Sequence, residues 1–239
     1  MLAEIYDILN PKEEVDKQRP FFEELVKKHS VTDVLDCACG TGLHLKMFHD
    51  MGLKAFGSDI SPEMLRIAKQ NLEGKYIPLK QEDFRTLSRS WGDTYGMIAC
   101  LTTSLPYMQT DEDIVIALTS MYERLSDGGI LVITNGITDS LLDTKPKFIP
   151  ARVNFDDAFY FVCEYHEEKT MTFNILYVKK TDNGMEHTFT STTYNAMRKA
   201  TLERAFAQTQ FKKIDYYGDH EFAPYSKDAS GTLIVVAEK

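Results

Sequence analysis

Hydrophobic positions follow two patterns along the chain, and the change between them separates two kinds of structure. Before about residue 145, short apolar runs alternate with segments that repeat apolar residues about every 3.6 positions, as amphipathic helices do. Alternation of this kind is typical of a parallel sheet covered by helices. The expected strands are Thr32–Cys37, Lys54–Ser58, Tyr76–Leu79, Met97–Leu101 and Ile130–Asn135, and the expected helices are 13–29, 43–51, 61–71 and 111–125.

The helical period disappears between about Phe148 and Tyr194. Strand-like runs replace it at Ala158–His166, Met171–Lys180 and His187–Tyr194, and Asp182-Asn183-Gly184 is a hairpin turn signal between the last two. Afterwards we expect a helix at 197–208, followed by strands at 211–217 and 232–237 that pair antiparallel at one edge. The sequence therefore predicts a doubly wound α/β domain, residues 1–145 and 195–239, with an inserted antiparallel sheet, residues 146–194, that forms part of a substrate lid.

Composition and charge exclude several classes of function. The net charge of −9 repels phosphate backbones, so nucleic acid is not the expected partner. No run approaches the roughly 20 apolar residues of a membrane span, and the first residues lack the features of a signal peptide. The four cysteines lie mostly in apolar runs, Cys37-Ala38-Cys39 has the wrong spacing for zinc, and no metal site is expected. We predict reduced thiols and a cytoplasmic protein.

The run Val34-Leu35-Asp36-Cys37-Ala38-Cys39-Gly40-Thr41-Gly42 carries the strongest chemical signal. An apolar strand ends in an acid, and two glycines then allow the chain to turn beneath a ligand. Asp59 ends the next strand and can accept both ribose hydroxyl protons, while Asp83 and Phe84 can bind adenine. A dinucleotide site needs a third glycine where Leu45 stands, and Asp36 suits an ammonium group better than a pyrophosphate. The pattern favours S-adenosylmethionine (SAM) over NAD.

The runs VLDCACGTG, SDISPEML, EDF and IACLTTSLPYM together resemble the class I SAM-dependent methyltransferases, and in particular the glycine N-methyltransferase-like group. The resemblance implies a Rossmann-like sheet and a small-molecule substrate. In that group an arginine before the first strand binds the SAM carboxylate; Glu14 stands at that position here, so Lys17 or Arg19 would take its place. The cofactor-binding residues that the motifs imply are Lys17, Arg19, Asp36, Ala38, Gly40, Gly42, Asp59, Ile60, Met64, Asp83, Phe84, Leu101 and Thr102.

For the substrate side we predict Tyr6, Asn135, Arg152, Tyr194 and Tyr225. Tyr6 resembles the N-terminal tyrosine that covers the cofactor in many such enzymes, and Tyr194 resembles the tyrosine that leads into the helix after the insertion. His44 is expected on the first helix, outside the chemistry. The predicted reaction is N-methylation of a small amine or amino acid, with glycine or sarcosine first.

Other readings stay open at this level. O- or C-methylation of another metabolite would use the same cofactor residues, and so would a protein that binds SAM without turnover. A nucleic-acid methyltransferase is disfavoured because Ser104-Leu105-Pro106-Tyr107 lacks the first proline of its motif, and an NAD-dependent oxidoreductase because of Leu45. The oligomeric state is not readable from the sequence.

Overall fold

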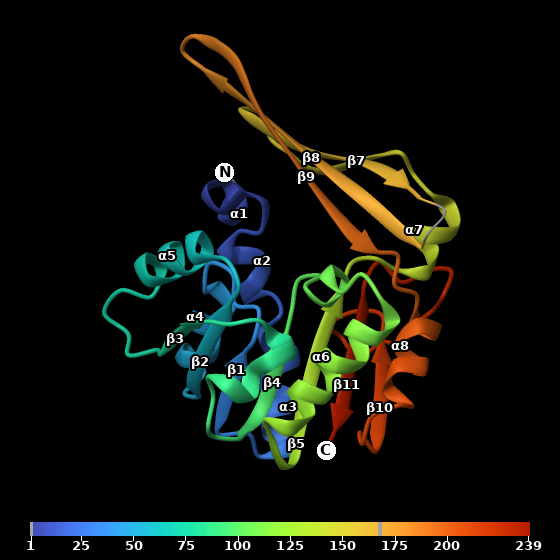
Figure 1. Cartoon of the computed structure of the whole chain (residues 1–239). Helices are drawn as coiled ribbons and strands as arrows, with labels where there is room; N and C mark the ends of the chain where they lie inside the picture. Colours follow the sequence, from blue (N-terminus) through green and yellow to red (C-terminus); the bar gives the residue numbers. More distant parts are fainter. Residues whose placement is uncertain (1, 167–168) are drawn as a thin grey trace.

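Two separate sheets organise the chain in the computed structural model, which describes residues 2–166 and 169–239 (Figure 1). The larger sheet has the order β10-β11-β5-β4-β1-β2-β3, in which β1 to β5 are parallel and β11 runs antiparallel to both of its neighbours. Its strands are β1 Asp33–Asp36, β2 Lys54–Asp59, β3 Leu79–Gln81, β4 Tyr95–Cys100, β5 Leu125–Asn135, β10 Lys213–Tyr217 and β11 Leu233–Glu238. The chain order reverses between β1 and β4, the point where open α/β sheets bind ligands.

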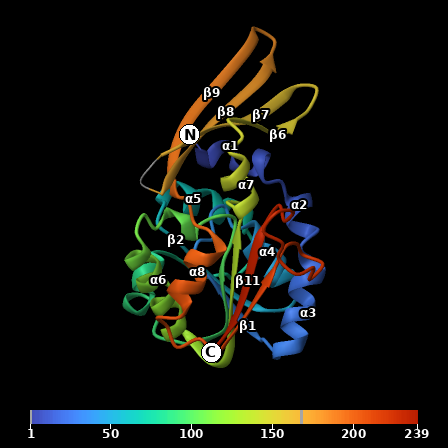
Figure 2. The same cartoon turned by 90° about the vertical axis from the view of Figure 1, so that its right-hand side faces the viewer.

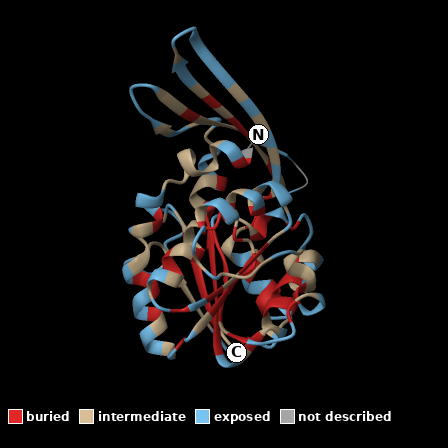
Figure 3. Ribbon diagram, turned by 90° about the vertical axis from the view of Figure 1, so that its left-hand side faces the viewer, coloured by how far each residue is buried: buried red, intermediate tan, exposed pale blue. Residues whose placement is uncertain are grey.

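Helices cover both faces of this sheet (Figure 2) because alternate residues of each strand point to opposite sides. Val34 packs with α3 and α4 on one face, whereas Leu35 packs with α6 and α8 on the other. The central strands are consequently buried on both sides (Figure 3). The helices are α1 Leu2–Leu9, α2 Lys12–Asp16, α3 Arg19–His29, α4 Leu43–Asp50, α5 Pro62–Asn71, α6 Asp111–Glu123, α7 Asp139–Thr144 and α8 Lys199–Phe206, with short 3₁₀ turns η1 Phe84–Arg89 and η2 Leu105–Tyr107.

The second sheet lies above the carboxyl ends of the parallel strands (Figure 1) and has the order β6-β7-β8-β9. Its strands are β6 Phe148–Val153, β7 Asp157–Tyr165, β8 Thr170–Thr181 and β9 Gly184–Asn195. Phe159, Ile175 and Tyr177 on its inner face pack against Ile5, Ile8 and Leu9. Helix α1 is therefore enclosed between the second sheet and the α/β part of the chain.

The predicted α/β fold with its antiparallel strand pair and separate antiparallel sheet is confirmed. The antiparallel member of the pair, β11, lies one position inside the edge, which β10 occupies. All four cysteines are buried free thiols. Within residues 2–166 and 169–239, no helix is long and apolar enough to cross a bilayer, and no three His, Cys, Asp or Glu side chains group as metal ligands.

Several local predictions were wrong. The helix expected over 13–29 is divided into α2 and α3, since the ring of Pro20 in the first turn of α3 cannot accommodate the carbonyl of a continuous helix. The third strand begins at Leu79 rather than Tyr76, and β5 begins at Leu125 with Gly128 in a bulge rather than after a glycine helix cap. Helix α1, of eight residues, and the six-residue elements α7 and β6 were not predicted.

Gly57 in β2 is the point of closest contact between the sheet and α4. A Cβ added there would overlap with Leu45 and would lie 2.9 Å from Leu79 Cδ2. We expect Gly57→Ala to lower the free energy of unfolding by about 1–3 kcal/mol through overpacking. Gly92→Ala is the matched control, because nothing lies within 4 Å of its added Cβ. Urea denaturation that gives equal stabilities for the two variants would contradict the close contact.

Candidate active site

The turn after β1 is tied to the end of β2 by a single side chain. The amide N–H of Gly40 donates to Asp59 Oδ2 at 2.8 Å, and the N–H of Ser61 donates to Asp59 Oδ1 at 2.9 Å. Gly42 has a φ of +84°, which favours glycine, and it begins α4 without a side chain to cap the helix. Asp59 thus fixes the loop and also brings a carboxylate to the carboxyl edge of the sheet.

Asp36 lies beneath the same loop and is only 1% exposed. Its Oδ1 accepts the N–H of Ala38 at 3.2 Å. Burial raises the pKa of Asp36 to about 7, and the carboxylate of Asp59 adds to the rise. Burial raises the pKa of Asp59 as well, against three backbone N–H groups that lower it. A cation bound here would stabilise the ionised form of Asp36.

The residues around Asp59 and after β4 complete the edge of the site. Ile60 is 64% exposed, and Met64 donates its N–H to Ser61 Oγ in the first turn of α5. After β4, Leu101 is buried, and Thr102 adopts a φ of +55° while its N–H donates to Thr134 Oγ1 at 2.7 Å. A non-glycine residue in the left-handed region is strained backbone of a kind that clusters at functional sites.

Helix α1 places Tyr6 over the glycine loop. A Cβ built on Gly40 would lie 3.7 Å from Tyr6 Cε1, so the ring rests against the turn. The next residue holds the helix in place: Asp7 accepts hydrogen bonds from Thr41 Oγ1 and, at 2.8 Å, from Asn71 Nδ2. Burial raises the pKa of Tyr6, and the nearby Tyr107 hydroxyl raises it further.

Tyr107 and Tyr194 meet beside Tyr6, although they come from η2 and β9. Tyr194 donates its hydroxyl to that of Tyr107 at 3.2 Å, and the two rings pack edge to face with centroids 4.8 Å apart. Gln109 Nε2 donates to the carbonyl of Thr193 at 3.0 Å and ties the same two segments together. Burial raises the pKa of Tyr194, and Tyr107 is the next cause.

A narrow cavity of about 20 Å³ lies between α1, α2 and the glycine loop. Its lining combines predicted residues with new ones: Tyr6, Asn10, Val15, Ala38, Cys39, Gly40, Thr41, Leu43, His44, Leu101 and Thr102. A larger hollow of about 350 Å³ lies near Tyr122, Arg124 and Lys239, at the amino end of β5. Since open α/β sheets bind ligands at the carboxyl ends of their strands, the narrow cavity marks the site.

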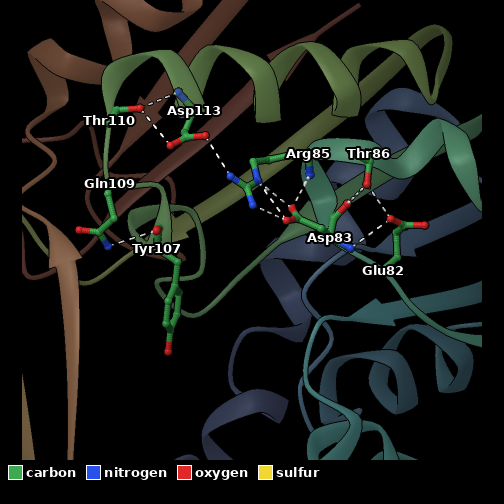
Figure 4. A network of polar contacts seen from close by, with 8 residues as sticks. All are labelled: Glu82, Asp83, Arg85, Thr86, Tyr107, Gln109, Thr110 and Asp113. Carbon is green, nitrogen blue, oxygen red and sulfur yellow. Dashed lines mark hydrogen bonds and ion pairs between the residues drawn. The ribbon is translucent and has the colours of Figure 1, made fainter.

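Asp83 lies at the start of η1, where its carboxylate is already paired (Figure 4). Arg85 donates to Asp83 Oδ2 at 2.6 Å through Nη2 and to Asp113 Oδ1 at 3.0 Å through Nη1. The predicted contact of Asp83 with adenine would have to share this carboxylate with Arg85. Phe84 packs partly buried against the core beside α6.

The structure does not bring every predicted residue to the cavity. Lys17 Nζ pairs with Glu14 Oε1 at 2.6 Å, and Arg19 pairs with Glu23; neither lines the cavity. The amide of Asn135 is bonded on both sides to the backbone of Ile137, and the hydroxyl of Tyr225 is bonded to Asp139. These four side chains are engaged elsewhere, so a direct role for any of them remains only a prediction.

Arg152 lies in β6 opposite Phe159, on the inner face of the second sheet. Tyr194 aligns across β8 with Met171 and Tyr165, six residues along β7 from Phe159. At about 3.3 Å per residue the two positions are roughly 20 Å apart. An acceptor the size of glycine beside Tyr194 cannot also contact Arg152.

Sequence reasoning missed Tyr107, His44 and Gln18. His44 lies on the helix where it was expected; its Nε2 is 3.1 Å from Gln18 Oε1, and its ring lines the cavity. Burial lowers the pKa of His44 to about 4, with His220 contributing, so the ring is neutral near pH 7. The one available signal was the place of His44 in the first turn of α4, directly after the glycine loop.

The raised pKa of Asp36 gives a test in the pH dependence of stability. A folded pKa of about 7, above the ordinary 3.8, means that Asp36 stabilises the fold at low pH and loses this contribution as the pH rises through 7. Between pH 5 and 8, wild type should lose about 2–3 kcal/mol relative to Asp36→Asn. Denaturation at both pH values measures this difference. Asp127→Asn, at an exposed acid, is the control, and parallel pH profiles for Asp36→Asn and wild type would contradict the assignment.

Known proteins share both the sequence pattern and the fold. A family model described as a methyltransferase domain matches residues 34–129. A glycine/sarcosine/dimethylglycine N-methyltransferase from Actinopolyspora halophila is 27% identical over 98% of this chain, which spans 40% of that protein's length. A glycine/sarcosine N-methyltransferase from Halorhodospira halochloris is 28% identical over 98% of this chain and 85% of its own length.

A solved structure extends the likeness to three dimensions. A SAM-dependent methyltransferase from Clostridium acetobutylicum ATCC 824 superimposes with a TM-score of 0.85, at 17% identity, over 99% of this chain and 97% of that one. The glycine loop and the acids Asp36 and Asp59 lie within residues 34–129, the range that the methyltransferase domain model matches. The family match, the curated relatives and the fold together support a class I SAM-dependent methyltransferase near the glycine N-methyltransferase-like group, with SAM as its cofactor.

Proposed function

We propose that this protein methylates the nitrogen of a small amine or amino acid, with glycine and sarcosine as the first substrates to test. The observation that carries the proposal is the hydrogen-bonded pair Tyr107 and Tyr194, together with Tyr6, whose ring rests on Gly40 and whose pKa is raised by burial and by the Tyr107 hydroxyl. Oxygen atoms at this place can orient an amine and stabilise its charge. The relatives that methylate glycine and sarcosine support this substrate class.

The residues of the loop fit SAM. Asp59 would hold the ribose hydroxyls, and the buried carboxylate of Asp36 with the backbone near Ala38 would hold the ammonium end of the methionine part. When bound, SAM supplies a methyl group on a positively charged sulfur. Tyr6, held by Asp7 against Thr41, would cover this group and exclude water.

The three tyrosines act by position rather than by ionisation. Burial raises the pKa of Tyr6 and of Tyr194, so both remain protonated at neutral pH and do not serve as bases. A neutral phenol can accept a hydrogen bond from an N–H group and can direct the nitrogen lone pair. The amine proton would then leave to solvent, and orientation would supply the main catalytic advantage.

The second sheet acts as a lid in this proposal. Tyr194 lies near the end of its strand β9, and the hydrogen bond from Gln109 to the carbonyl of Thr193 joins that strand to the segment after η2. The inner face also closes over α1 through Phe159, Ile175 and Tyr177. The division predicted from the sequence, with residues 146–194 as a substrate-binding insertion, agrees with this role.

Binding of SAM tests the cofactor part of the proposal. Calorimetric titration should show SAM binding by wild type, with the affinity lowered at least about 10-fold by Asp59→Ala because the ribose loses its acceptor. Asp127→Ala removes the same charge at an exposed position at the far end of β5 and should bind as wild type does. Thermal unfolding of each variant confirms that it is folded. A folded Asp59→Ala that binds SAM normally would contradict the assigned role.

Transfer of a labelled methyl group tests the acceptor. With glycine or sarcosine, Tyr194→Phe should lower kcat by about 10-fold or more, because a hydrogen bond that orients the nitrogen is lost. Tyr160→Phe is the control, since Tyr160 lies on the outer face of the same sheet, stacked on Phe148 at 4.9 Å. Equal activity of the two variants would remove Tyr194 from the site, and no transfer to any amine by a SAM-binding wild type would overturn the proposed reaction.

A further inference from the structure

Gln109 is hydrogen-bonded to both neighbours of Tyr194 in strand β9. Its Nε2 donates to the carbonyl of Thr193 at 3.0 Å, and its own backbone carbonyl accepts from Asn195 Nδ2 at 3.3 Å. Asn195 is only 5% exposed, so its side-chain amide is shielded from water. We call these two bonds the Gln109 clamp. Because they lie on either side of Tyr194 along the strand, they fix the position of its backbone relative to residue 109.

The same side chain also bonds to Tyr107, the other phenol of the pair. Gln109 Nε2 donates to the carbonyl of Tyr107 at 3.2 Å (Figure 4). An amide NH2 group carries two donors, so Gln109 can serve the carbonyls of Tyr107 and Thr193 together. It therefore joins the backbones of the two segments whose tyrosine hydroxyls meet at 3.2 Å.

The second sheet by itself does not set the distance from β9 to η2. β9 is an edge strand with β8 as its one neighbour, so the side of its backbone that faces away from β8 has no partner strand. Phe173 of β8 packs edge to face against Tyr194, with centroids 5.6 Å apart, and this contact orients the ring within the sheet. The Gln109 clamp supplies the bonds that run from this edge to the segment after η2.

We infer that Gln109 is a positioning residue for methyl transfer: through Thr193 and Asn195 it places Tyr194 against Tyr107. It acts through Tyr194 and not on the substrate. The inference rests on the proposed function, in which the Tyr194 hydroxyl orients the acceptor nitrogen. Loss of the clamp should therefore slow the transfer and leave the binding of SAM unchanged, because the residues assigned to SAM lie on the glycine loop and the parallel strands.

Fluorine NMR of the full chain containing fluorotyrosine tests the placement of Tyr194 without any acceptor. The signal of Tyr194 is identified by its loss in Tyr194→Phe. In wild type, Tyr107→Phe should shift this signal, because the hydroxyl that Tyr194 contacts is removed. In Gln109→Ala the same substitution should shift it by less than half as much, since the two phenols have already moved apart. Equal shifts in the two backgrounds would overturn the inference.

Kinetics with glycine or sarcosine test the consequence for transfer. Gln109→Ala should lower kcat by about 3- to 10-fold, the loss expected for one hydrogen bond, and should leave the affinity for SAM unchanged. In a Tyr194→Phe background it should have no further effect, since it acts through the hydroxyl of Tyr194. A structural role alone would lower kcat by the same factor in both backgrounds, and that result would also overturn the inference.

Two further variants complete the comparison. Asn195→Ala removes the other bond of the clamp and should lower kcat in the same way, which provides a second measurement. Gln208→Ala is the matched control and should behave as wild type, because Gln208 is also an exposed glutamine whose Nε2 donates to a carbonyl, that of Arg204 at 3.1 Å. A wild type that binds SAM and methylates no amine would overturn the proposed function alone, and the NMR comparison would still decide the role of Gln109.

Discussion

The hydrogen bond between the Gly40 amide and the Asp59 carboxylate is the constraint on which the site depends. It joins the turn after β1 to the end of the neighbouring strand β2, so that two loops at the carboxyl edge of the sheet have one fixed geometry. The same carboxylate orders the start of α5 through Ser61. A second acid, Asp36, is buried close by, and burial raises the pKa of both carboxyl groups because it disfavours their charged forms. A cationic ligand relieves this effect, which is one physical reason for SAM to bind here.

The top of the site is assembled from distant parts of the chain. Helix α1 contributes Tyr6, η2 contributes Tyr107, and β9 contributes Tyr194. Helix α1 is held in place by apolar packing under the second sheet and by the hydrogen bond from Thr41 in the glycine loop to Asp7. The site is therefore closed by side chains that belong to neither the glycine turn nor the parallel strands. In the proposed function, substrate choice depends on this upper layer and cofactor binding on the lower one.

The two basic side chains predicted to bind the cofactor do not line the cavity. Lys17 and Arg19 are close to the expected position in sequence, yet both lie outside the cavity in surface ion pairs. His44 lies on α4, directly after the glycine turn, and its ring lines the cavity.

The sequence by itself determined the α/β fold, the glycine turn and the acids Asp36 and Asp59, because all of these arise from short-range patterns: apolar periods, a helix cap, and glycines between a strand and a helix. It also predicted the antiparallel insertion from its β-rich runs and turn signal. Only the tertiary structure decided that Tyr107 meets Tyr194, that the Tyr225 hydroxyl is bonded to Asp139, and that Arg152 is far from Tyr194. The two tyrosine contacts join residues 87 and 86 positions apart, and the place of Arg152 depends on strand register; no local pattern encodes either.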